Sequence, residues 1–146
     1  MAFISITRLR VRSFLYLPQF LWQASKSSRQ AERSPGFLGG RLMRNPKNTF
    51  WTMTAWTDDA AMSAYRIAGA HSTVMPKLRS WCDEASVTHW NQESPELPSW
   101  QEAHRRMVGE GRLSKVNHPS PNQVLSQIPA PTASPVEQVL KPAENH

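Results

Sequence analysis

His71 is the histidine whose position is best suited to catalysis. It follows Gly69-Ala70 at an expected helix junction, and a neutral imidazole takes up a proton near pH 7, as a general base must. The alternative is a histidine that caps a helix or faces solvent. No two histidines are three or four residues apart, the spacing that places two metal ligands on one helix face, so the sequence predicts no metal site.

Two further histidines fall in segments with clear local patterns. His89 shares an expected strand face with Val87 and Asn91, which favours a core or interface position over a ligand. His104 lies on a strongly charged helix and is expected to face solvent.

Aromatic side chains could form a cavity for a flat ligand. Trp51, Trp56 and Tyr65 lie within one short stretch of the chain, and their rings suit flat ligands. Arg8 could pair with an anionic group of such a ligand. The alternative is ordinary packing, because aromatic side chains dominate protein cores. These four residues are the candidate substrate-binding residues.

The composition excludes several classes of protein. Cys82 is the only cysteine, so no internal disulfide forms, and the neighbouring Asp83 and Glu84 should raise the pKa of its thiol. No run approaches 18 apolar residues, so no transmembrane helix is expected. Residues 1–47 carry nine Lys/Arg against one acid, but no nucleic-acid-binding motif accompanies them. We expect a cytoplasmic protein with neither nucleic acid nor membrane as a partner.

Hydrophobic periodicity predicts the elements that position these side chains. Period two indicates strands, and apolar residues at helical spacing indicate amphipathic helices. The expected strands are 2–12, 37–44, 49–56 and 85–92, and the expected helices are 14–33, 57–69, 73–82 and 99–108. Ser13 and Thr57 are the expected N-caps of the first two helices. The order β-α-β-β-α-β predicts an α+β, ferredoxin-like fold.

The connection between the second and third strands also has a readable pattern. Asn45-Pro46-Lys47-Asn48 separates two apolar runs, which predicts a hairpin. Gly39-Gly40 inside the first run predicts a bulge or a close backbone approach.

The third strand indicates that both faces of the sheet are covered. Phe50 and Trp56 point to one face, whereas Trp51 and Met53 point to the other. A sheet with helices on one side only should be polar on its open face. We expect a second copy of the chain to cover that face in a homodimer, because two-fold dimers are the commonest oligomers. The alternative is that the C-terminal helix covers it.

The segment 113–146 differs in composition from the rest of the chain. It holds six of the twelve prolines and no aromatic residue. Its apolar surface is too small to offset the entropy of ordering it. The sequence predicts a domain over 1–112 followed by a Pro-rich, disordered tail over 113–146, either a plain spacer or a docking peptide.

The stretch from Thr49 to Met62, followed by Gly69-Ala70-His71, carries a family resemblance. It resembles the antibiotic-biosynthesis-monooxygenase-like proteins of the dimeric α/β-barrel superfamily. Residues 2–112 look closest to a related domain family of unknown function, and a fainter similarity to spheroidene monooxygenase implies haem. The resemblance implies a homodimer with a ligand cavity between each sheet and its helices.

The resemblance also assigns roles to particular positions. In the haem-degrading branch, a first-strand Asn, a helix Trp and a His bind haem; the similar positions here are Thr7, Ala61 and His71, so only the histidine is retained. The cofactor is therefore either haem or none. The expected function is a monooxygenase-like protein that holds a small aromatic or polycyclic substrate in an apolar pocket, with His71 as base or ligand. The alternative is a non-catalytic ligand-binding or dimerisation module.

Overall fold

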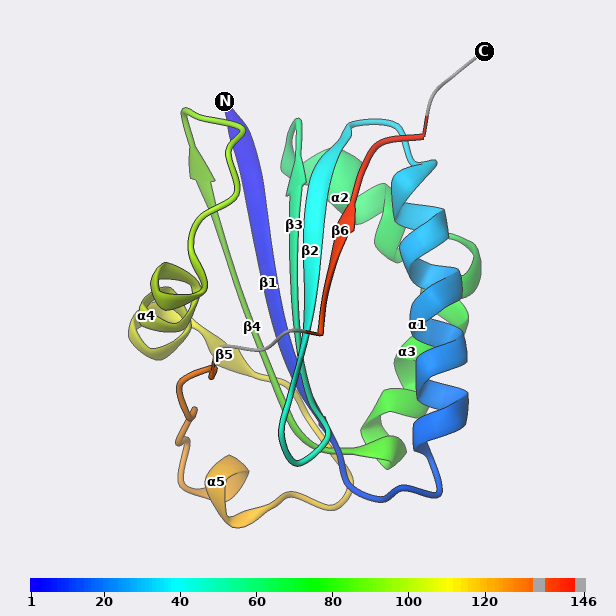
Figure 1. The fold of residues 1–146 in the computed structure, drawn as a ribbon, viewed down its shortest axis with the longest axis vertical. Coiled ribbons are helices and arrows are strands. Elements are labelled where there is room, and N and C mark those ends of the chain that lie inside the picture. Colours follow the sequence, from blue (N-terminus) through cyan, green and yellow to red (C-terminus); the bar gives the residue numbers. More distant parts are fainter. Residues whose placement is uncertain (133–135, 144–146) are drawn as a thin grey trace.

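The computed structural model describes residues 1–132 and 136–143, and within these it leaves out the side chains of 70–72. The strands are β1 (Ala2–Val11), β2 (Phe37–Asn45), β3 (Thr49–Trp56), β4 (Cys82–Gln92), β5 (Arg112–Leu113) and β6 (Glu137–Leu140). The helices are α1 (Leu17–Glu32), α2 (Asp59–Arg66), α3 (Gly69–Trp81), α4 (Trp100–Glu110) and α5 (Pro121–Val124). One sheet separates α1, α2 and α3 from α4 (Figure 1).

The sheet confirms the predicted ferredoxin-like arrangement. Its strand order is β5-β4-β1-β3-β2-β6, and each neighbouring pair is antiparallel. β1 lies between β3 and β4, and the helices join β1 to β2 and β3 to β4, as the split βαβ arrangement requires. β4 begins three residues before the expected 85, because β1 continues its pairing as far as Val11 opposite Cys82.

The predicted hairpin and bulge are both present. Lys47 (φ 62°) and Asn48 (φ 57°) adopt the left-handed conformation that turns the chain between β2 and β3. The pairing of β2 with β3 shifts register between Phe37 and Gly39. At Gly40 a Cβ atom would lie 2.7 Å from the carbonyl oxygen of Met53, so this position requires glycine because the backbones approach too closely for a side chain.

Helices α1, α2 and α3 cover one face of the sheet with two apolar clusters. The first contains Phe3, Ala31, Phe37, Trp56 and Leu140, and the second contains Val11, Phe20, Val74, Trp81 and Cys82. Phe20 of α1 lies 4.7 Å from Phe50 of β3, measured between ring centroids. The amphipathic helix predicted for this segment therefore packs on β3 through Phe20.

The second face of the sheet is covered by the chain itself. Ala103 and Met107 of α4 are buried against residues of β1, β2, β3 and β4, with Leu97, Trp100 and Ile128 at the margin. The alternative that the C-terminal helix covers this face is thus what the structure shows. A second copy is therefore not needed to shield the apolar side chains of β3 on this face, and the homodimer stays a prediction.

The prediction of a disordered tail is wrong for the described part of 113–146. β6 pairs with β2 over four residues, Leu140 is 3% exposed, and the backbone N–H of Thr132 donates to Asn45 Oδ1 over 2.7 Å. Composition misleads here because the segment adds little apolar surface of its own. It is ordered by hydrogen bonds to a sheet edge and by a few anchoring side chains.

Leu140→Ala tests whether this segment is anchored. We expect the free energy of unfolding to fall by about 2 kcal/mol or more, because the change leaves a cavity in a packed cluster. The neighbouring Val139 is 59% exposed, so Val139→Ala is a matched control expected to change stability by less than about 0.5 kcal/mol. Chemical denaturation measures both. Equal, negligible effects of the two variants would show that β6 is not docked.

The helix starts differ from the predicted caps in two places. α1 begins after Tyr16 without a side-chain cap, and Ser13 Oγ instead accepts the N–H of Leu15. Asp58, and not Thr57, caps α2, its Oδ1 accepting the N–H of Ala61 over 2.8 Å. A carboxylate at this position both accepts that bond and faces the positive end of the helix. Among the described residues, no helix is long and apolar enough to cross a bilayer.

Candidate functional site

The sheet separates the predicted site residues into two groups. Trp56 and Tyr65 lie on the side of α1, α2 and α3, whereas Trp51 lies on the side of α4. Arg8 lies with Trp51, its guanidinium carbon 6.0 Å from the centre of the indole ring. Positions 51 and 56 have opposite parity on one strand, so their side chains point to opposite faces. The four residues cannot line a single cavity.

Trp56 and Tyr65 form the aromatic pair on the helical side. Their ring centroids are 5.1 Å apart with a tilt of 33°, and Phe37 meets Trp56 edge-on at 5.2 Å. The indole N–H of Trp56 donates to Thr54 Oγ1 over 3.0 Å. α2 holds Tyr65 over the end of β3, which explains why a Trp at the end of a strand and a Tyr on the next helix meet.

The hydroxyl group of Tyr65 is a fixed hydrogen-bond donor. It donates to the carbonyl oxygen of Ser27 over 3.1 Å. Burial raises the pKa of Tyr65 well above its usual value, an effect only partly offset by the hydrogen bond at Ser27. The phenol is therefore protonated throughout the physiological pH range.

Helix α1 contributes two polar groups that the sequence analysis missed. Gln23 Oε1 and Ser27 Oγ are buried, and neither has a hydrogen-bond partner among the described residues. A buried polar atom without a partner costs free energy and calls for an explanation such as water or a ligand. Their spacing could have predicted their burial, because they lie three and seven residues after Phe20, on the helix face that packs on the sheet.

The histidines do not form one site. His71 falls within α3, and its side chain lies outside those the structure describes, so its role stays a prediction. His89 is exposed, and its ring lies 5.3 Å from that of Phe3, so the expected core position is wrong and the interface position stays a prediction. His104 is half-buried, and its Nε2 lies 2.8 Å from the carbonyl oxygen of Ile128. His104 therefore holds the C-terminal segment against α4 and is not simply solvated.

Arg8 is already paired inside the protein. Its Nη1 lies 2.7 Å from Glu84 Oε1, and both side chains are buried. Arg10 lies 3.3 Å from the other oxygen of Glu84, to which the Ser120 hydroxyl also donates over 2.7 Å. Ser120 comes from the segment before α5, so this network also ties the C-terminal segment to the sheet.

Two adjacent acids in this network have pKa values shifted in opposite directions. Burial raises the pKa of Glu84, but hydrogen bonds from Ser120 and Arg8 and the charges of Arg8 and Arg10 outweigh burial, and the net shift is downward. Burial raises the pKa of Asp83, and the charge of Arg10 offsets only part of that increase. Glu84 is thus the ionised partner of Arg8.

Two cavities of the described structure offer no ligand for haem iron. One cavity of about 220 Å³ adjoins Arg8, and another of about 450 Å³ lies between α4 and the segment after α5. Neither is lined by a histidine, cysteine or methionine, the usual neutral or thiolate ligands of haem iron. Among the described residues, no three of His, Cys, Asp and Glu gather as a metal site would require.

Cys82 is a packing residue. Burial, and secondarily the charge of Asp83, raise the pKa of its thiol to about 12. The thiol is therefore protonated at neutral pH, in agreement with the expectation that it is not a reactive nucleophile.

Comparison with known proteins shows the fold. No family model matches the chain, and no curated protein matches it. Among solved structures, a conserved protein from Methanosarcina mazei Go1 is 10% identical, with a TM-score of 0.56 over 64% of this chain and 94% of that one. SnoaB, a cofactor-independent oxygenase from Streptomyces nogalater, is 18% identical, with a TM-score of 0.54 over 67% and 98%.

A third similar structure is described as a monooxygenase. It is a putative antibiotic biosynthesis monooxygenase from Nitrosomonas europaea, 15% identical, with a TM-score of 0.55 over 64% of this chain and 92% of that one. About a third of this chain therefore lies outside each match, while each neighbour is matched over nearly its whole length. The chain shares the ferredoxin-like fold of the antibiotic biosynthesis monooxygenase-like proteins.

Proposed function

We propose that this protein is a monooxygenase-like protein that binds a small aromatic substrate between the sheet and helices α1, α2 and α3. The observation that carries the proposal is the Trp56–Tyr65 pair. Tyr65 is hydrogen-bonded to α1 at Ser27, and α1 carries two buried polar atoms that lack partners among the described residues. An aromatic wall with a few convergent polar groups is the usual composition of a small-molecule site. One protein of the same fold is a cofactor-independent oxygenase, which supports the reaction class.

The proposed roles follow from the chemistry of each side chain. Trp56 packs against the flat substrate. Tyr65 gives its only hydroxyl proton to Ser27, so its oxygen accepts a hydrogen bond from a substrate hydroxyl group. His71 accepts the proton of a substrate phenol, which raises the electron density that O2 attacks. A phenol with a free para position then reacts with one O2 to give a quinone and water, so the substrate supplies all the electrons.

Oxygen consumption with a panel of polycyclic phenols tests this proposal. We expect His71→Ala to lower the rate tenfold or more, since proton transfer by a positioned side chain contributes about 10²–10⁴-fold. Tyr65→Phe should lower it about two- to tenfold, because it removes one hydrogen bond to the substrate. Tyr16 is the only other tyrosine, and its hydroxyl accepts from Arg12 over 2.9 Å, so Tyr16→Phe is the matched control and should keep full activity. Turnover that is unchanged in both test variants would contradict the proposed roles.

A non-catalytic module is the second candidate. Trp56 is 0% exposed and packed by Phe37 and Tyr65, which is what a purely structural tryptophan shows. The same panel separates the candidates: binding that is saturable and lost in Tyr65→Phe, without oxygen uptake by any variant, supports a ligand-binding module.

The predicted homodimer would need an interface other than the sheet face that α4 covers. The sheet face expected to meet a second copy is filled by α4, with Ala103 and Met107 buried against it. Light scattering at micromolar concentration tests the predicted homodimer against the mass of one chain, 16.6 kDa. Twice that mass would establish the homodimer and place its interface elsewhere on the molecule.

A further inference from the structure

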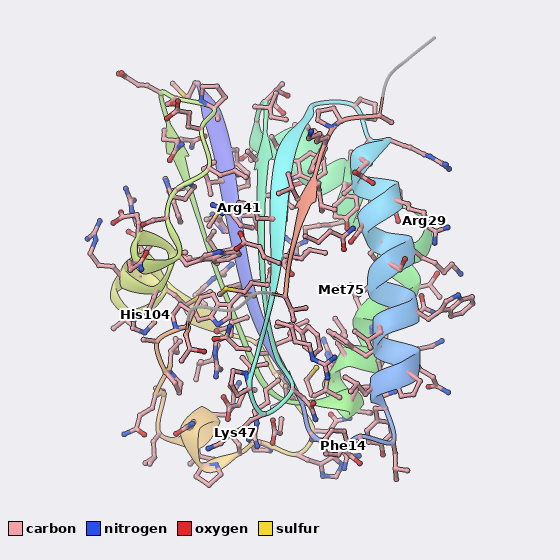
Figure 2. The ribbon with its side chains drawn as sticks, viewed as in Figure 1. Phe14, Arg29, Arg41, Lys47, Met75 and His104 are labelled. Carbon is pink, nitrogen blue, oxygen red and sulfur yellow. The ribbon has the colours of Figure 1, made fainter. Side chains whose placement is uncertain are left out.

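A cleft on the α4 side of the sheet is independent of the proposed catalytic layer. It has a volume of about 220 Å³ and lies between the β2–β3 hairpin and the C-terminal segment. Figure 2 shows Lys47 at the tip of that hairpin. Pro129, Ala130 and Thr132 form the opposite wall. The cleft therefore exists only because the segment predicted to be disordered is docked.

The charged groups of the cleft leave an excess of one positive charge. Arg8, Arg10 and Lys47 line it together with Glu84. Asp83 faces Arg10 from 3.2 Å, so three cations meet two carboxylates. Both carboxylates lie against Arg10, and Glu84 is also bound by Arg8. Lys47 forms no ion pair with a described residue, and its side chain is exposed at the rim.

Arg8 brings an unused donor to this cleft. Its Nη1 binds Glu84, but its Nε is buried and has no partner among the described residues. Ser86 Oγ, directly across from Arg8 in the β1–β4 register, is likewise buried without a described partner, but Ser86 does not line the cleft. Leaving a charged donor unsatisfied in a protein interior costs about 1–3 kcal/mol or more, so an acceptor group is expected there.

We propose that this cleft binds a small organic carboxylate. The ligand's carboxylate accepts from Arg8 Nε and pairs with Lys47, and its apolar part packs against the Trp51 ring and Pro129. One net positive charge matches a monoanion. A volume of about 220 Å³ lies below the range of about 300–1,000 Å³ typical of drug-sized ligands, which limits the ligand to about the size of a single substituted ring.

Titration calorimetry of the full chain with benzoate at low salt tests the proposal. Benzamide has nearly the same shape without the charge, and inorganic phosphate is a compact anion without the ring. We expect saturable binding of benzoate, with benzamide and phosphate each at least tenfold weaker. Equal binding of benzoate and benzamide, tighter binding of phosphate, or no binding of benzoate would each overturn the carboxylate assignment.

Substitutions of exposed lysines test the proposal without disturbing the fold. Lys47→Gln should weaken benzoate binding at least threefold and Lys47→Glu should weaken it further, because the ammonium pairs with the carboxylate. Lys115 is also exposed and does not line the cleft, so Lys115→Gln is the control expected to bind benzoate as the wild type does. Benzoate affinity that is the same in all three variants would place the ligand elsewhere and overturn the proposal.

Discussion

Replacing Glu84 by leucine should lower the free energy of unfolding by about 3–5 kcal/mol, because it leaves the buried Arg8 guanidinium without its counter-charge. The side chains of Arg8 and Glu84 are 6% and 2% exposed, and their charged atoms are 2.7 Å apart. Because so little of the Arg8 side chain is exposed, water compensates only a small part of its charge. Urea denaturation of the two proteins measures the difference.

The double variant Arg8→Met/Glu84→Leu distinguishes the loss of a pair from the isolation of a charge. Removing both partners takes away the buried charge as well as its attraction, so much of the stability should return. Glu102 provides the control, since its ion pairs with Arg105 and Arg106 are on the surface, and Glu102→Gln should cost about 1 kcal/mol or less. A double variant as unstable as Glu84→Leu would show that packing, not charge, sets the cost.

The same pair predicts how stability depends on pH. The folded pKa of Glu84 is lowered, so its contribution is fully present above the ordinary glutamate pKa of about 4.3. That contribution is lost as the pH falls through the lower folded value. Asp83, with a raised pKa, contributes with the opposite sign. Denaturation between neutral pH and pH 3 should therefore show a loss of stability on acidification that is smaller in Glu84→Leu than in the wild type.

Trp51→Ala should lower the free energy of unfolding by a similar amount, about 3–5 kcal/mol. Trp51 is 1% exposed and lies beneath α4, with its ring centroid 6.4 Å from that of Trp100 and 6.3 Å from that of His104. Truncation removes a buried tryptophan from the layer between the sheet and α4 and leaves a cavity that the strand backbone cannot close. Thermal denaturation followed by circular dichroism measures the effect.

Trp22 is the matched control for this prediction. It is 61% exposed on α1, where its ring meets the ammonium of Lys26 at 4.3 Å. Losing this exposed contact should cost about 1 kcal/mol or less. Similar stability of Trp51→Ala and Trp22→Ala would mean that α4 does not shield the second sheet face, and the case for a second copy on that face would return.

The alternation of side chains along the third strand was enough to predict that the candidate aromatic residues do not share one site. Trp51 and Trp56 point to opposite faces by the alternation of strand side chains alone, so the sequence was sufficient to divide the candidate aromatic residues. Gln23 and Ser27 could also have been found, because their spacing from Phe20 places them on the buried stripe of α1. The Arg8–Glu84 pair could not, since two residues 76 positions apart meet only through the register of β1 with β4.

The sequence by itself determined the order of the elements from β1 to α4, the ferredoxin-like class and the requirement that both faces of the sheet be covered. These follow from periodicity and from side-chain types within short windows. Only the tertiary structure decided what covers the second face. α4 and a second copy of the chain would bury the same side chains of β3, and no local pattern distinguishes them. The ordering of the Pro-rich segment has the same origin: its stability comes from Asn45, Glu84 and the edge of β2, which are distant in sequence and close only in the folded protein.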